Sequence, residues 1–109
     1  MQVGNILILA DQLGNSGDGE IPRSIKEKME NCYKNIEGVH KEFGASLENI
    51  IDETWFFTNV NERVENVNEI FFTRERILGC KPEFSQSLVW TTNLVSPEYE
   101  LEIKCIAAL

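Results

Sequence analysis

The feature that most constrains the fold is a stripe of apolar residues at helical spacing in the first half of the chain. Apolar side chains recur at steps of three and four residues between Pro22 and Gly44, namely Ile25, Met29, Cys32, Tyr33, Ile36, Val39 and Phe43. This spacing places them on one face of an α-helix. Pro22 suits the first turn of such a helix, and Gly44 is a natural end. We therefore predict a long amphipathic helix that buries one face against another layer.

Segments with the character of strands lie on both sides of this helix. Ile6 to Leu9 is a continuous apolar run, as in a strand that is covered on both faces. Ile50 to Thr58 is rich in β-branched and aromatic residues, which favours a strand. Two further strands are predicted at the end of the chain, Ser85 to Leu94 and Tyr99 to Ala108, with a turn at Ser96-Pro97 between them.

A second helix is predicted between the strand at Ile50 and the two final strands. Asn59 or Asn61 would cap its start, and Gly79 would end it. Its apolar stripe consists of Val64, Val67, Phe71 and Leu78. The order strand, helix, strand, helix, strand, strand indicates an α+β fold in which two helices cover one face of a sheet.

The whole chain, residues 1–109, is predicted to be a single domain. With 109 residues and 42% apolar content, it has enough material for one ordinary core. The strands carry apolar residues at both parities, as in Trp55-Phe56-Phe57, whereas two helices cover only one face of the sheet. The second face therefore needs a partner, and association with further copies of the chain is the economical solution.

The charge of the chain disfavours nucleic acid and membranes as partners. The net charge is −8, and the ten Lys and Arg residues are interleaved with Asp and Glu rather than gathered in a patch. Such a chain repels phosphate backbones and anionic lipid. The apolar run Asn5 to Ala10 is too short to span a membrane and lacks the basic start of a signal peptide.

The cysteines point to a reducing compartment. Cys32, Cys80 and Cys105 are odd in number, and no pair has the spacing of metal ligands. A zinc site or a Cys-His nucleophile would have to be assembled from isolated residues, because His40 is the only histidine. We therefore expect a soluble, cytoplasmic protein without a metal or other cofactor.

Three segments at fixed order and spacing carry a resemblance that covers nearly the whole chain. They are Gly44-Ala45-Ser46-Leu47-Glu48-Asn49-Ile50-Ile51, Val67-Asn68-Glu69-Ile70-Phe71 and Leu101-Glu102-Ile103-Lys104-Cys105-Ile106-Ala107. With this pattern the chain resembles the Rid (YjgF/RidA) family, also described as endoribonuclease L-PSP-like. The resemblance implies a YjgF/chorismate-mutase-like fold, a homotrimer around a central barrel, and small-molecule clefts between adjacent subunits.

The arginine that characterises the deaminases of this family is missing. In those relatives it grips the carboxylate of a 2-imino acid. The gapless match to Leu94 places Gln86 at this position, whereas a match anchored on Pro82 places Phe84 there. Replacing two charged hydrogen bonds with one neutral amide would lower the affinity for such an anion by ~10–100-fold. Arg74 and Arg76 are the candidates to replace it, but nothing in the sequence brings either of them to the cleft.

Other positions implied to line the cleft have also changed. The Ser-Gly-Gln triplet of the family becomes Ala10-Asp11-Gln12, which removes a hydroxyl and adds a carboxylate that disfavours anionic ligands. The alternative interpretation of Asp11 is an ordinary turn residue. Leu88 stands where a backbone amide of the family faces the ligand. The chain also starts at Met1 within the segment that carries the family's tyrosine lid, so we expect this lid to be missing unless Trp90, Tyr99 or Phe84 takes its place.

Two positions match the family pattern. Glu102 corresponds to the glutamate that is thought to position the water attacking the imine, and a carboxylate beside a cleft suits that role. The alternative is that Glu102 is a strand residue paired with a lysine or arginine. Asn68 corresponds to the family's helix asparagine, which either contacts the ligand or supports the wall of the cleft.

Three functions are compatible with these residues. The favoured one is a homotrimeric protein that binds a small metabolite in its inter-subunit clefts. The alternative is an enamine/imine deaminase, a hydrolase with altered substrate in which Glu102 orients the water. The third is the endoribonuclease activity attached to the family's name, and the acidic charge and the lack of a basic or aromatic single-strand track argue against it.

Overall fold

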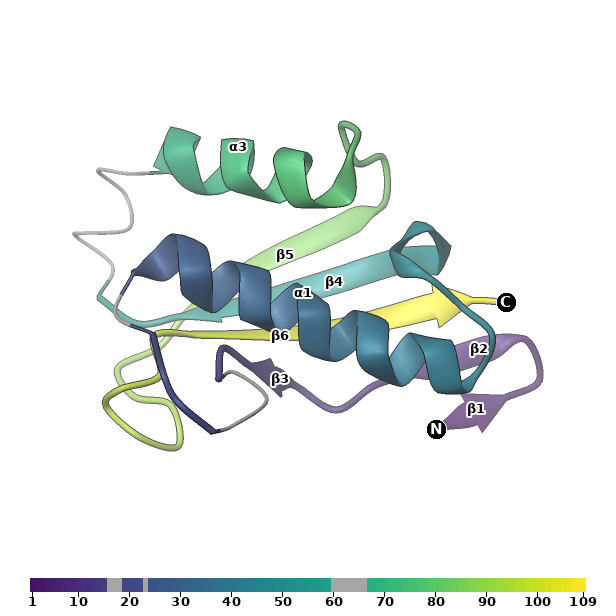
Figure 1. Ribbon diagram of the computed structural model, residues 1–109, viewed down its shortest axis with the longest axis horizontal. Helices are drawn as coiled ribbons and strands as arrows, with labels where there is room; N and C mark the ends of the chain where they lie inside the picture. Colours follow the sequence, from purple (N-terminus) through teal and green to yellow (C-terminus); the bar gives the residue numbers. More distant parts are fainter. Residues whose placement is uncertain (16–18, 23, 60–66) are drawn as a thin grey trace.

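The computed structural model describes residues 1–15, 19–22, 24–59 and 67–109 (Figure 1). Its elements follow one another as β1 (Gln2–Val3), β2 (Ile6–Ile8), β3 (Gln12–Leu13), α1 (Ile25–Glu42), the 3₁₀ helix η1 (Leu47–Asn49), β4 (Ile50–Phe57), α3 (Val67–Leu78), β5 (Ser85–Trp90) and β6 (Leu101–Ala108). Among the described residues, no helix is long and apolar enough to cross a membrane.

The strands form one mixed sheet. Its order is β1-β2-β6-β4-β5, and β3 pairs with β6 beyond the end of β2. β4 and β5 are parallel neighbours, and the other pairs are antiparallel. Figure 1 shows α1 lying across the middle of the sheet and α3 beside it, towards β5. The α+β fold with two helices on one sheet is therefore confirmed.

Helix α1 confirms the predicted amphipathic stripe. It begins after Ser24, whose hydroxyl accepts a hydrogen bond from the backbone N–H of Glu27 at 3.2 Å. Its buried apolar residues Met29, Cys32, Tyr33 and Ile36 face the sheet. The helix also lies very close to Gly14, where a Cβ atom would stand 2.9 Å from the carbonyl oxygen of Lys28. Only glycine leaves room for this approach.

The central strands alternate between the helix layer and an open face. In β6 the buried residues are Leu101, Ile103, Cys105 and Ala107, and the residues between them point the other way. A bulge in β4 between Ile50 and Asp52 shifts the register by one residue. Ile50, Glu53, Trp55 and Phe57 are consequently all buried under the helices. The open face carries apolar side chains too, including Ile8 and Val89, each more than a third exposed.

Several boundaries differ from the sequence-based expectation. The strand predicted for Ser85 to Leu94 ends at Trp90, and the final strand starts at Leu101 instead of Tyr99. The predicted turn at Ser96-Pro97 is confirmed by a hydrogen bond from the N–H of Tyr99 to the carbonyl of Ser96 at 3.1 Å. Asn61 and Val64 lie outside the described residues, so the predicted start of the second helix is not tested.

Two short strands were not predicted. β1 and β2 form a hairpin whose two-residue loop contains Gly4 at φ +59°, as tight hairpin turns require. The register pairs Val3 with Ile6. β3 is only two residues long and lies between the predicted strand that ends at Leu9 and the predicted first helix, where we expected neither a strand nor a helix. Both strands are too short to show an alternating pattern in the sequence.

Candidate functional site

Glu102 and Asp11 form a pair of carboxyl groups at the start of β6. Glu102 is opposite Leu13 of β3 in the sheet register, and Asp11 directly precedes β3. The pairing of β3 with β6 therefore brings the two carboxyl groups into hydrogen-bond contact. In this contact a protonated Glu102 donates to the carboxylate of Asp11.

The environment of Glu102 suits proton transfer near neutral pH. Partial burial raises the pKa of Glu102 most, followed by the hydrogen bond to Asp11 and the negative charge of Asp11, and together they bring it to about 7. A carboxyl group with such a pKa exists in both protonation states at neutral pH, as a general base or acid requires. No basic side chain of the described residues forms an ion pair with Glu102.

The triplet Ala10-Asp11-Gln12 is held by a local contact. The side-chain amide of Gln12 donates to the carbonyl of Ala10 at 2.9 Å, across Asp11. Ala10 and Asp11 are both exposed. The hydrogen bond does not involve the carboxyl group of Asp11. This group contacts Glu102, and Asp11 is the more solvent-exposed residue of the two.

Gln86 takes part in a different cluster, which is buried under the helices. Its amide donates to Oε1 of Glu53 at 2.9 Å, and Nε of Arg74 lies 2.7 Å from the same oxygen. The hydroxyl of Tyr33 donates to Oε2 of Glu53 at 2.8 Å. Glu53 is fully buried. Burial raises the pKa of Glu53, and the contacts with Arg74, Tyr33 and Gln86 oppose that rise.

Arg74 is held on further sides by aromatic rings. Its guanidinium carbon lies 4.9 Å from the ring centroid of Phe84 and 5.5 Å from that of Trp55. Arg74 therefore does lie close to Gln86, which could not be predicted from the sequence. Its charge, however, is already matched by Glu53.

Within one chain, the six predicted site residues do not lie together. Five of them are divided between the two faces of the sheet, and the sixth, Asn68, is on α3. Ala10, Asp11 and Glu102 gather at one place. In the β4–β5 register, Gln86 is opposite Glu53 and Leu88 is opposite Trp55, so both lie on the helix side. Phe56, which is opposite Glu102, lies on the other side. Asn68 is an exposed residue in the first turn of α3. A ligand-binding role for Gln86, Leu88 and Asn68 stays a prediction.

Glu53 is the residue that the sequence interpretation missed. A signal was present, because Glu53 has the same parity as Trp55 and Phe57 in a strand that is otherwise apolar on that side. A carboxylate at such a position requires buried partners. The identity of those partners depends on how α1 and α3 pack, which the sequence pattern does not specify.

The only histidine is paired with a cysteine in the core. His40 Nε2 lies 3.7 Å from Sγ of Cys105, and its Nδ1 lies 2.9 Å from the carbonyl oxygen of Ser46. Burial and the nearby charge of Glu53 raise the pKa of Cys105 to about 12. The thiol is therefore protonated and shielded, which does not suit a nucleophile. In the part of the chain that is described, no cluster of His, Cys, Asp and Glu suits a metal ion.

Comparison with known proteins decides the family. A family model described as Endoribonuclease L-PSP matches residues 1–109. The chain belongs to the endoribonuclease L-PSP family. This is the Rid (YjgF/RidA) family, so the resemblance found in the sequence is confirmed. The family's name does not assign a nuclease activity to this member.

Individual relatives agree with this assignment. A RutC family protein of Aquifex aeolicus is 26% identical over 108 residues, which are 97% of this chain and 84% of that protein. The structure of E. coli TdcF with bound serine has a TM-score of 0.83 at 23% identity and covers 100% of this chain and 84% of that chain. The YjgF gene product of E. coli also gives a TM-score of 0.83, at 20% identity, covering 99% and 84%. Both structures share the fold of this Rid family member.

Proposed function

We propose that this Rid family member hydrolyses an enamine or imine, with Glu102 and Asp11 as its acid-base pair. The observation that carries the proposal is the contact between these two carboxyl groups on the exposed side of β3 and β6. Glu102 matches the residue that positions water in the family's deaminases. It forms no ion pair with the described basic side chains, and its pKa is about 7. The sequence alone favoured a binding protein, and this contact shifts our preference to the hydrolase.

The proposed reaction is the addition of water to a C=N bond. Ionised Glu102 accepts a proton from water, while the water oxygen bonds to the imine carbon. Glu102 then passes this proton to the nitrogen, which gives a carbinolamine. Glu102 next accepts the proton of the carbinolamine hydroxyl and returns it to the amine nitrogen, the C=O bond forms as the C–N bond breaks, and a carbonyl compound and ammonia leave. Asp11 keeps the pKa of Glu102 close to the working pH, so that the same carboxyl group accepts and returns the proton.

The preferred substrate in this proposal is a neutral or cationic imine. Asp11 adds a negative charge beside Glu102, and the positions matched to the family's arginine carry Gln86 or Phe84. Arg74 does not compensate, because its Nε lies 2.7 Å from the carboxylate of Glu53. A substrate carboxylate would therefore meet repulsion without a guanidinium to oppose it.

We further propose that the protein is a cytoplasmic homotrimer with the substrate held between subunits. The support is the open face of the sheet, where Ile8, Phe56, Val89 and Ile106 are not covered by helices. Such an apolar face favours association with copies of the chain. The three cysteines are all free, in keeping with a reducing compartment. A similar structure, E. coli TdcF, holds serine, which supports a small ligand on this fold.

The test compares ammonia release from 2-iminobutanoate and from its neutral amide, each generated in situ. The proposal predicts faster hydrolysis of the amide by the wild-type protein, and loss of hydrolysis in Glu102→Gln.

The second candidate function is binding without catalysis, which is favoured by the missing arginine. It predicts no ammonia above background from either compound, together with a ligand affinity that Glu102→Gln changes only a few-fold.

A further inference from the structure

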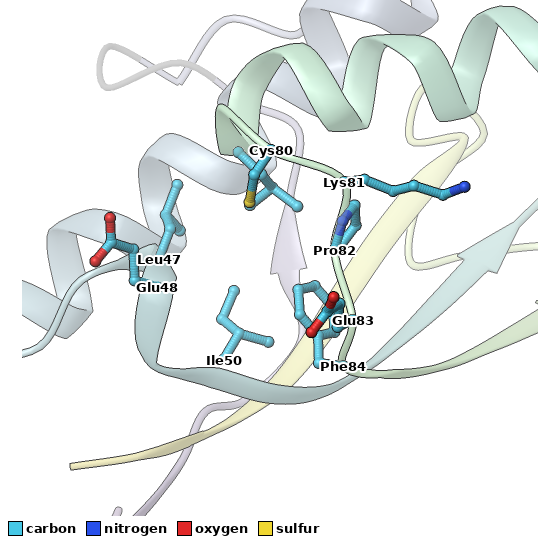
Figure 2. A pocket seen from close by; sticks show the side chains of 9 residues that line it. Leu47, Glu48, Ile50, Cys80, Lys81, Pro82, Glu83 and Phe84 are labelled. Atoms are coloured by element: carbon cyan, nitrogen blue, oxygen red, sulfur yellow. The ribbon is translucent and has the colours of Figure 1, made fainter.

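A cavity of about 460 Å³ lies apart from the Asp11–Glu102 pair. It is formed by η1, the start of β4 and the connection from α3 to β5 (Figure 2). Ile50 in its wall is opposite Ala107 in the sheet register and is buried on the helix side. Glu102 faces the other side of the sheet, so the cavity is a separate feature of the molecule.

The walls of this cavity are largely apolar. Leu47, Ile50, Leu78, Pro82 and Phe84 contribute hydrocarbon surface. In Figure 2 the side chain of Ile50 and the sulfur of Cys80 both point into the space between η1 and the connection. A volume in this range with mostly hydrophobic walls and a few polar groups is typical of small-molecule sites. The body of a fitting ligand is therefore an alkyl or aromatic group.

The charges around the cavity favour a cation. Two carboxylates, Glu48 and Glu83, stand against a single ammonium, that of Lys81. In Figure 2 the Lys81 side chain extends away from the other lining side chains, whereas the carboxylate of Glu83 overlaps the ring of Phe84 in this view. All three residues are exposed, and the whole chain carries a net charge of −8. The electrostatic potential around the cavity is therefore negative.

We propose that this cavity is a second binding site, which takes a small molecule with an apolar body and a protonated amine. The apolar body fills the space between Leu47, Ile50 and Phe84, and the ammonium group lies near the carboxylate of Glu83. The site is independent of the proposed hydrolysis, because Glu102 and Asp11 contribute nothing to it.

Three probes of equal size and different charge test the proposal: 2-phenylethylamine, 2-phenylethanol and phenylacetate. Binding is followed by the NMR shifts of the methyl groups of Leu47, Ile50 and Leu78. A second readout is the protection of Cys80 from iodoacetamide, since Cys80 is exposed while Cys32 and Cys105 are buried. We expect saturable binding of the amine with a Kd on the order of millimolar, as for a small fragment. The amine should bind about three- to tenfold more tightly than the alcohol, and phenylacetate most weakly.

Two variants and one control make the result decisive. Cys80→Trp should fill the cavity and abolish binding of all three probes. Glu83→Gln should remove most of the preference for the amine and leave the alcohol unchanged. Glu27→Gln, an exposed carboxylate that does not line the cavity, makes the same change in net charge and should preserve the preference. Equal binding of the three probes, or no saturable binding, would overturn the proposal. If Cys80→Trp does not fold, Glu83→Gln against Glu27→Gln decides alone.

Discussion

Nε of Arg74 lies 2.7 Å from Oε1 of the fully buried Glu53. This ion pair joins α3 to β4, and Gln86 and Tyr33 complete the hydrogen bonds of the carboxylate. A guanidinium thus lies beside Gln86, the residue that the sequence analysis matched to the deaminase arginine, and its charge is paired with Glu53 inside the protein. The chemistry that remains exposed is that of Asp11 and Glu102.

Removing Glu53 should destabilise the protein strongly. Glu53→Ala leaves the guanidinium of Arg74 buried without its partner, which costs about 3–5 kcal/mol of unfolding free energy. The double variant Glu53→Met with Arg74→Met should recover most of this loss. Urea unfolding measures each value. As a control, Glu30→Ala breaks the exposed pair between Arg76 and Glu30, also 2.7 Å long, and should cost at most about 1 kcal/mol.

The pH dependence of hydrolysis should report the Asp11–Glu102 pair. Activity that needs ionised Glu102 rises as the pH passes its pKa of about 7. In Asp11→Asn the negative charge beside Glu102 disappears, the pKa of Glu102 falls, and the rise moves to lower pH. The pH profile of kcat/KM measures this shift. An unchanged profile would show that Glu102 does not carry the rate-determining proton transfer.

Glu102 should also influence stability, with a predictable sign. Its pKa is raised from 4.5 to about 7 by folding, so the folded state binds the proton more tightly than the unfolded state. This contribution is fully present below pH 4.5 and is lost as the pH rises to about 7. Above that pH, Glu102→Gln should therefore stabilise the protein, by about 1 kcal/mol after screening by solvent. Urea unfolding of both proteins at pH 4.5 and pH 8 checks this, and equal differences at the two pH values would contradict it.

Two glycines associated with α1 should respond in opposite ways to alanine. At Gly14 the new Cβ would stand 2.9 Å from the carbonyl of Lys28, so Gly14→Ala should cost about 1–3 kcal/mol. Gly38 lies within α1 and has open space at its Cβ position. Gly38→Ala should stabilise the helix by about 1 kcal/mol. Thermal unfolding of the two variants gives both signs, and destabilisation of similar size in both would refute the close approach of Gly14 to α1.

The thiols should differ in reactivity. Cys80 is exposed, whereas burial raises the pKa of Cys32 and Cys105. Iodoacetamide should therefore modify Cys80 alone in the native protein and all three cysteines in denaturant. Mass spectrometry of the peptides distinguishes the sites. Rapid native modification of Cys105 would mean that the core around His40 opens readily.

The helices, the main strands and the family could be predicted from the amino-acid sequence, because they depend on local periodicity and on the spacing of motifs. The stripe from Ile25 to Phe43 and the alternation in Leu101 to Ala107 specify which face of each element is buried, whatever the partner is. The hairpin of β1 and the two residues of β3 were not predictable, since such short strands are defined by their pairing with β2 and β6.

The contacts between polar residues could not be predicted in this way, because they depend on tertiary packing. Asp11 and Glu102 are 91 positions apart, and only the pairing of β3 with β6 brings their carboxyl groups together. The bulge after Ile50 and the packing of α1 and α3 likewise bury Glu53 with Arg74, Tyr33 and Gln86, and place Gln86 on the opposite face from Glu102. Such contacts depend on register and crossing geometry, which are set by the packing of the whole core rather than by any local stretch of residues.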